Sequence, residues 1–237
     1  MERLAKSLGK VFIAFTVAAL AFCLVGCGSS EPKQEEKPLE VTSGYAQDEN
    51  SGLMSVGVKI KNPNENLQFD NAALSITVKD ADGKVIASDD EFMVGDVLPN
   101  EEFAVALTMA PGERTADSID VQIHSDAPNK SDATSGVTIN EDTVSTKYDY
   151  EKGYSTATLA TVNGEYSNET ELNYDSILVT ALFFDSEGNI IGAGMDDQWG
   201  AAKGTIPFEI YGDSQGSPEN IASFKTYAHV YTMNHSN

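Results

Sequence analysis

The chain has 237 residues, and its 37 acidic side chains against 15 lysines and arginines give it a net charge of −22. Nucleic acids and anionic lipid headgroups carry the same sign of charge, so the composition argues against both as ligands of the folded part. The two cysteines, Cys23 and Cys27, both lie near the amino terminus, so the rest of the chain must be stabilised by burial rather than by disulfides. There is no CxxC pair, zinc-ligand spacing or redox motif, and no cofactor is expected.

The first 27 residues have the pattern of a targeting segment. Three basic residues and one acidic residue lie before an apolar stretch, residues 11–26, that has the length of a signal-peptide core. The stretch ends in LVGC, residues 24–27, which resembles a bacterial lipobox. The resemblance implies cleavage between Gly26 and Cys27 and attachment of a diacylglycerol to the Cys27 thiol. The protein would then be anchored in the bacterial cell membrane, facing the extracytoplasmic side; an ordinary signal peptide with a chance cysteine is the alternative.

Residues 27–40 predict a flexible tether between this anchor and the folded part. The sequence GSSEPKQEEKPLE, residues 28–40, is polar and charged, contains two prolines and offers almost nothing to bury. Thirteen residues reach at most about 45 Å when fully extended. The tether therefore holds the acidic body away from the membrane surface.

From Val41 onward the pattern predicts an all-β chain. Short apolar alternations are broken by Gly, Asn, Asp or Pro every 8–12 residues, and no helical periodicity is sustained. Apolar and polar residues alternate over 74–79 and 119–123, and 103–107 have the same short-strand character, as expected for half-buried strands.

The chain then repeats itself after a polar segment with the composition of an interdomain linker, residues 127–140. Matching positions run in the same order through both halves: Val56, Val58, Ile60 and Asn62 match Val162, Gly164, Tyr166 and Asn168; Leu74, Ile76 and Val78 match Val179, Ala181 and Phe183; residues 103–107 match 206–210. His124 also falls on His229. We therefore expect two tandem immunoglobulin-like β-sandwich domains, residues 41–126 and 141–237, with about seven strands each.

Two acidic turns occupy the same place in each repeat. ITVKDADGKVI, residues 76–86, and ALFFDSEGNII, residues 181–191, both read as hairpins in which an aspartate bonds the turn amides and a glycine takes a left-handed conformation. Together with the conserved order of elements, these stretches resemble the FxLYD domain family. The resemblance implies an immunoglobulin-like sandwich that recurs in bacterial envelope lipoproteins, with no assigned activity.

The acidic turns raise calcium binding as an alternative. Asp80 and Asp82 have the spacing that opens a calcium loop, but the bidentate glutamate that such a loop needs is missing. Asp89 and Asp90 cluster after the next strand, where a solvated rim is favoured over a divalent-cation site. No metal site is therefore predicted, and these four aspartates remain weak candidates.

One motif could indicate an enzyme. Residues 212–216, GDSQG, match the G-x-S-x-G nucleophile elbow, with His229 and His235 following. That chemistry needs a strand-to-helix turn in a parallel α/β sheet, and this chain has no such units. We predict that Ser214 is a loop residue and that the protein is not an enzyme.

Aromatic residues gather in the second repeat. Eight of nine tyrosines, among them Tyr148 and Tyr150, and the single tryptophan, Trp199, follow residue 140. Burial in the core is the expectation for such residues. A binding surface in which Trp199, in a glycine-flanked loop, stands beside Asp196 and Asp197 is the alternative, for a protein partner or for a sugar.

The sequence thus predicts a non-enzymatic, lipid-anchored envelope lipoprotein whose two domains serve protein interaction. Its expected partners are membrane lipid, through Cys27, and an envelope protein or cell-wall component. A cell-wall or carbohydrate-binding module on the second domain and a metal-linked accessory lipoprotein are the alternatives.

Overall fold

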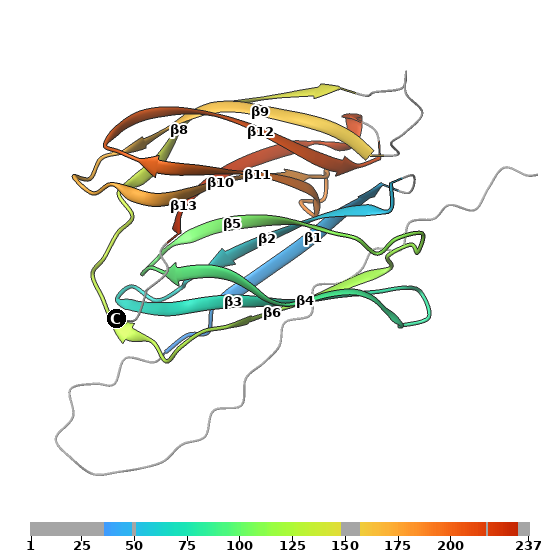
Figure 1. Ribbon diagram of the computed structural model, residues 1–237, viewed down its shortest axis with the longest axis horizontal. Coiled ribbons are helices and arrows are strands. Elements are labelled where there is room, and N and C mark those ends of the chain that lie inside the picture. Colours follow the sequence, from blue (N-terminus) through green and yellow to red (C-terminus); the bar gives the residue numbers. More distant parts are fainter. Residues whose placement is uncertain (1–35, 49–50, 148–156, 217, 232–237) are drawn as a thin grey trace, which may run out of the picture. The chain divides into compact units, whose positions relative to one another are not determined.

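The computed structural model describes residues 36–48, 51–147, 157–216 and 218–231, which belong to a unit that spans residues 36–237 (Figure 1). Apart from a short 3-10 turn at Pro218–Asn220, its regular structure is β, and the strands pair antiparallel. In the described part of the chain, no helix has the length and apolar character needed to cross a bilayer. The strands are β1 (Glu40–Asp48), β2 (Leu53–Lys61), β3 (Leu67–Lys79), β4 (Val85–Val97), β5 (Glu102–Met109), β6 (Ser118–His124), β7 (Asn129–Lys130), β8 (Val137–Lys147), β9 (Ala157–Asn168), β10 (Tyr174–Phe184), β11 (Ile190–Ala201), β12 (Gly204–Gln215) and β13 (Ser223–Tyr231).

The first half contains two sheets that enclose one core. Their strand orders are β1-β2-β5 and β4-β3-β6, with the short β7 added beside β3. The alternation predicted for residues 74–79 is confirmed, because Leu74, Ile76 and Val78 are fully buried while the residues between them are half-buried. The core between the sheets also includes Phe69 and Phe103.

The second half forms a single six-stranded sheet that folds back over its own core. Its order, β13-β10-β11-β12-β9-β8, repeats the two triplets of the first half, with β8-β9-β12 equivalent to β1-β2-β5 and β11-β10-β13 equivalent to β4-β3-β6. The two triplets are joined because Gly192–Gly194 of β11 pair with Gly212–Ser214 of β12. A Cβ atom on Gly192 would lie 2.0 Å from the carbonyl oxygen of Asp213, so this pairing requires glycine. Tyr166, Phe183 and Phe208 lie in the enclosed core.

Both predicted hairpins are confirmed. In each, an aspartate side chain accepts hydrogen bonds from backbone amides two and four residues ahead: Asp80 from Asp82 and Lys84, and Asp185 from Glu187 and Asn189. The following glycines, Gly83 and Gly188, have φ angles of 77° and 83°. Slight burial opposes ionisation of Asp185, but the hydrogen bonds from Asn189, Glu187 and Gly188 lower its pKa. The turn amides therefore account for the aspartate in both copies.

A buried asparagine closes the end of each half in the same way. The Nδ2 of Asn62 donates to the carbonyl oxygens of Leu67 at 2.7 Å and Leu98 at 2.9 Å, and its Oδ1 accepts from the amide of Asn64. At the matching position, Asn168 donates to Leu172 and Ala201 and accepts from the amide of Thr170. These equivalent networks confirm the alignment of the two repeats.

Replacing Asn62 by Ala should lower the free energy of unfolding by about 2 kcal/mol, because the buried carbonyl groups lose their donor. Urea denaturation followed by far-UV circular dichroism measures this change. Asn140→Ala is the matched control, since Asn140 is exposed and bonds only the Ser167 hydroxyl among the described residues. Equal midpoints for the two variants would contradict a structural role for Asn62.

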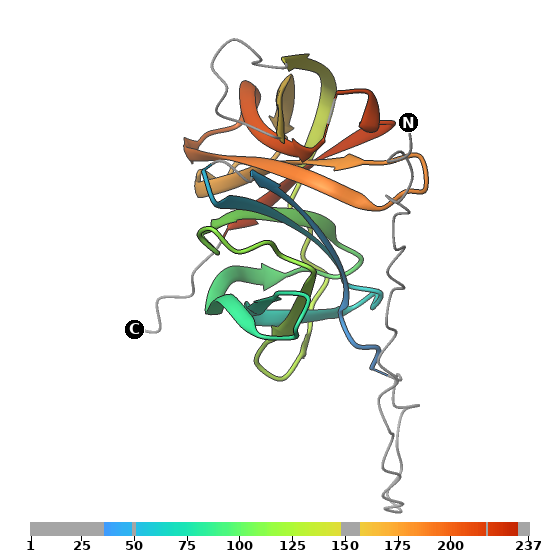
Figure 2. The same ribbon diagram turned by 90° about the vertical axis from the view of Figure 1, so that its right-hand side faces the viewer.

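The two halves contact each other directly. β1, β2 and β5 of the first half pack against β10, β11 and β13 of the second, and Figure 2 shows the blue strands β1 and β2 against the orange strands of the second half. Ala104 and Ala106 share a buried cluster with Leu182, Ile190 and Ala193. The segment predicted as a linker, residues 127–140, contains β7 and the first four residues of β8. The sequence pattern predicts a separate core in each half, whereas the structure adds a third cluster shared by both.

Candidate functional site

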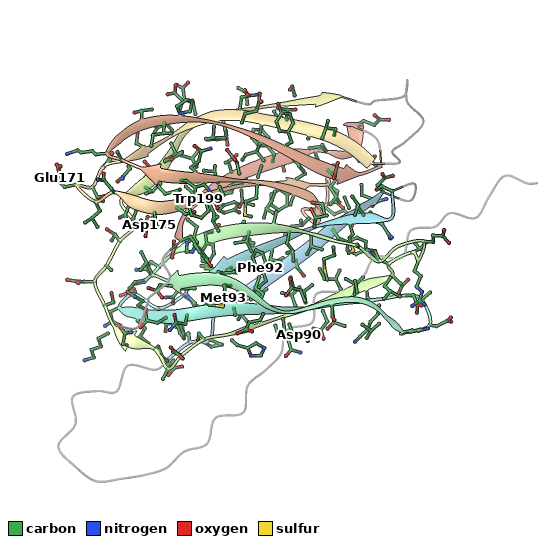
Figure 3. All side chains as sticks on the ribbon, in the orientation of Figure 1. Asp90, Phe92, Met93, Glu171, Asp175 and Trp199 are labelled. Atoms are coloured by element: carbon green, nitrogen blue, oxygen red, sulfur yellow. The ribbon has the colours of Figure 1, made fainter. Side chains whose placement is uncertain are left out.

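A cavity of about 430 Å³ opens where the two halves meet. The first half supplies residues from β2, β4 and β5, and the second half supplies residues from β11 and β12. Phe92, Leu107 and Met195 give it an apolar part, while Thr108 and Asp213 are polar. This volume lies within the range of pockets that bind small ligands. We call this cavity the junction groove; Figure 3 labels Phe92, one of its lining residues.

Close backbone packing between the halves sets the position of the groove walls. Gly44 on β1 and Gly57 on β2 are paired neighbours, and both face the second half. A Cβ on Gly44 would lie 2.0 Å from the carbonyl oxygen of Ile190, and a Cβ on Gly57 would lie 2.8 Å from the Cβ of Ala193. The Ser55 hydroxyl, which lines the groove, donates to the carbonyl oxygen of Ala193 at 2.9 Å. The wall from the second half is thereby held against β2.

A buried histidine makes a second connection between the halves. His229 of β13 stacks on Phe103 of β5, with 3.7 Å between ring centroids and 9° between ring planes. Its Nδ1 lies 2.8 Å from a carboxylate oxygen of Glu101, and its Nε2 donates to the carbonyl oxygen of Val94 at 2.8 Å. The ring has no exposed surface. Both nitrogens are thus used to join β13 to the first half.

The sequence indicates His229 as the match of His124 and as a histidine that follows the GDSQG motif, but it predicts no connecting role for it. The register confirms the match, since His124 pairs with Ala73 and His229 with Leu178, which are equivalent positions of the two repeats. His124 is exposed, whereas His229 is buried by the other half. The one sequence feature that could have indicated the burial of His229 is its place among the apolar residues at the end of β13.

The charge at the groove is negative. Asp213 is exposed to solvent on one side, yet partial burial, followed by the nearby Asp48 carboxylate, raises its pKa. Within the described residues, no ion pair joins Asp213 to a basic side chain, and no lysine or arginine lines the groove. A cationic group placed here would relieve the repulsion between the two carboxylates.

Replacing Asp213 by Asn should stabilise the protein slightly at pH 7. The raised pKa of Asp213 means that its ionised form opposes folding, so the gain is full above the folded-state pKa. It disappears below the ordinary aspartate pKa of about 3.9, where the carboxyl group is neutral in both states. Screening at this exposed position limits the gain to a few tenths of a kcal/mol, about 1 °C in Tm. Thermal unfolding at pH 7 and pH 3.5 checks the sign, and a larger gain at pH 3.5 would contradict it.

Trp199 does not lie in the core. Its relative exposure is 77 %, and it lies on β11 paired with Ser176 rather than in a loop, as Figure 3 shows. The prediction of burial was wrong because Trp199 lies near the end of β11, where it and Gly200 are both exposed. Trp199 lies on the same face of β11 as Met195, about 13 Å further along the strand.

Of the two aspartates of the predicted aromatic surface, only Asp197 lies on the same face of β11 as Trp199. Asp196 and Asp197 point to opposite faces of β11, as neighbours on a strand do. Asp197 accepts a hydrogen bond from the Ser176 hydroxyl, and Asp196 accepts one from the Gln198 side chain. Tyr148 and Tyr150 lie outside the described residues.

The weak metal candidates are also placed apart. Asp80 and Asp82 belong to the first hairpin turn, and Asp89 and Asp90 lie on β4, where Asp89 accepts from the amide of Glu91. Over the described ranges, no group of three potential metal ligands is present.

Ser214 lies on a strand rather than in a loop, so that prediction was wrong. β12 extends to Gln215 because it pairs with β9 throughout and with β11 at the glycines, and this pairing buries Ser214 completely. The Ser214 hydroxyl has no hydrogen-bond partner among the described residues. His229 uses both nitrogens elsewhere, and His235 lies outside the described residues. Ser214 therefore lacks the exposed turn and the base that a nucleophile elbow requires.

Comparison with known proteins identifies no family. No protein-family model matches the sequence, and no curated protein matches it. One matching solved structure is a β-glucuronidase from glycoside hydrolase family 2, with a TM-score of 0.30 and 11% sequence identity. The match covers 73% of this chain and 22% of that chain, so this protein spans about a fifth of the enzyme's length. A likeness this low carries no argument about fold or activity.

Proposed function

We propose that the protein is a non-enzymatic lipoprotein of the bacterial cell envelope, anchored through lipidated Cys27, that presents two immunoglobulin-like halves for binding another protein. The junction groove is the observation that carries the binding role. It combines an apolar part with polar side chains, among them the Asp213 carboxylate, and both halves contribute to it. Interfaces that bind proteins commonly pair an apolar centre with a polar rim.

The anchor follows from the sequence pattern of residues 1–27, which lie outside the described residues. In this proposal the peptide 1–26 is removed and residues 27–36 form the tether. The predicted tether is shortened at its end, because Lys37 bonds Asn64, Leu39 packs against the first core and β1 begins at Glu40. The repeated strand order of the two halves supports immunoglobulin-like sandwiches, and it agrees with a resemblance to the FxLYD family.

Two measurements on intact cells test this function. Palmitate labelling should mark the wild-type protein and disappear in Cys27→Ser; label that persists in the variant would refute the anchor. Photo-crosslinking followed by mass spectrometry should then recover a protein linked to residues 41–237. Crosslinks to cell-wall glycan alone would refute protein binding.

A carbohydrate-binding module on the second half is the second candidate, and the exposure of Trp199 favours it. An exposed aromatic ring can stack on a sugar. Binding of a sugar should shift the emission of Trp199, the single tryptophan of the chain. Unchanged emission with cell-wall oligosaccharides would eliminate this candidate.

A further inference from the structure

The outer edge of β5 is open at the junction groove. Among the described strands, β5 pairs with β2 alone, whereas its equivalent in the second half, β12, pairs with both β9 and β11. In the second half, the β11 pairing covers residues 212–214 of β12, and the first half has no such pairing between β4 and β5. Thr108 is exposed and Leu107 half-buried, and both line the groove. An unpaired strand edge offers backbone donors and acceptors to an added strand.

The groove beside this edge suits an extended peptide. Successive side chains of a strand point to opposite faces, so a segment paired with β5 would direct alternate side chains toward the groove. Phe92, Leu107 and Met195 supply apolar surface there. The volume of about 430 Å³ accommodates one large side chain and the adjoining main chain of about three residues.

The negative charge at the groove favours an occupant with a positive charge. Asp213 lines the groove with the Asp48 carboxylate nearby, and no ion pair to a described basic side chain neutralises Asp213. The exposed Tyr211, which also lines the groove, donates a hydrogen bond from its hydroxyl to the carboxylate of Glu209, two residues before it on β12. The Asp213 carboxylate is therefore complementary to a lysine or arginine side chain.

We propose that the junction groove binds an extended, basic segment of a partner protein by strand addition to β5. About three residues of the segment pair with residues 106–108, an apolar side chain enters between Phe92 and Met195, and a lysine or arginine two residues along the segment, on the same face, contacts Asp213. The inference rests on the proposed protein-binding function and names the chemistry of the partner.

The probe is the peptide acetyl-KTVTKTV-amide, which places lysine and valine alternately on one face of a strand, titrated by calorimetry into the mature chain carrying Cys27→Ser. Binding is expected, with an affinity about tenfold weaker in Asp213→Asn, because one charge-assisted contact is lost. Asp175→Asn is the matched control: it removes the same charge from an exposed residue of β10 away from the groove, and it should leave the affinity unchanged.

A peptide with alternate backbone amides methylated keeps the charge but cannot form the strand pairing. It should bind at least tenfold more weakly than the parent; equal binding by the two peptides would mean general attraction to an acidic protein and would overturn the proposal. An equal loss of peptide affinity in Asp213→Asn and Asp175→Asn would also overturn the proposal. Full displacement of the peptide by calcium at equal ionic strength would overturn it as well.

The cell crosslinking experiment separates the two claims. A partner protein linked at Thr108 supports both. A partner linked only at sites remote from the groove overturns strand addition but leaves the protein-binding function standing, and recovery of no protein removes both.

Discussion

Gly44→Ala is expected to destabilise the folded chain by at least about 2 kcal/mol, which lowers Tm by roughly 4–8 °C. The new Cβ would lie 2.0 Å from the carbonyl oxygen of Ile190, which belongs to the backbone and cannot rotate away. Gly57, its paired neighbour, is also confined, by the side chains of Leu182 and Ala193 at 2.7 and 2.8 Å from a built Cβ. β1 must therefore move away from β11, and that movement opens the buried cluster shared by the halves. Differential scanning calorimetry measures the loss.

Thr42→Ala is the matched control for this substitution. Thr42 is exposed and lies two residues before Gly44, so its side chain points to the same face of β1. Its Tm should stay within about 1 °C of the wild type. If Gly44→Ala also melted within that range, the close packing between β1 and β11 would be refuted.

His229→Ala should cost about 3–4 kcal/mol, the larger of the two effects. The substitution removes a fully buried ring stacked on Phe103 and leaves a cavity. It also leaves the carboxylate of Glu101, whose side chain is 10% exposed, without its histidine partner. The carbonyl group of Val94 loses its donor as well. Urea denaturation measures the sum of these losses.

The repeat provides the control, because His124 occupies the equivalent position in the first half and is exposed. His124→Ala should change the stability by no more than about 0.5 kcal/mol. His229→Phe keeps a ring against Phe103 but removes both hydrogen bonds, so it should recover only part of the loss. Equal stabilities of His229→Ala and His124→Ala would contradict the connecting role of His229.

The fold within each half could largely be predicted from the sequence. Alternating residues such as Leu74, Ile76 and Val78 determine which face of β3 is buried, and the aspartate and glycine of each turn determine the hairpin. These are local patterns, with a period of two or a span of five residues. The repeated positions of Asn62 and Asn168 also follow from sequence, because each closes its own half.

The junction between the halves could not be predicted in this way. By strand propensity alone, Gly44 and Gly57 would be expected to destabilise their strands. The need for glycine at these positions is seen only in the folded chain, where Ile190 and Ala193, more than a hundred residues away, lie against them. Trp199 was misplaced for a related reason: composition favours burial of tryptophan, but this residue lies near the end of β11, where it is exposed. The groove residues Leu107 and Asp213 meet only through this packing, so no local motif marks them. Lipidation of Cys27 stays a prediction.

Thermal unfolding of the mature chain carrying Cys27→Ser tests the central claim, that the two halves fold as one unit with the groove at their junction. Because the halves share a buried cluster and the His229 contacts, differential scanning calorimetry should record a single transition with equal calorimetric and van't Hoff enthalpies. Two separate transitions, one for each half, would contradict it.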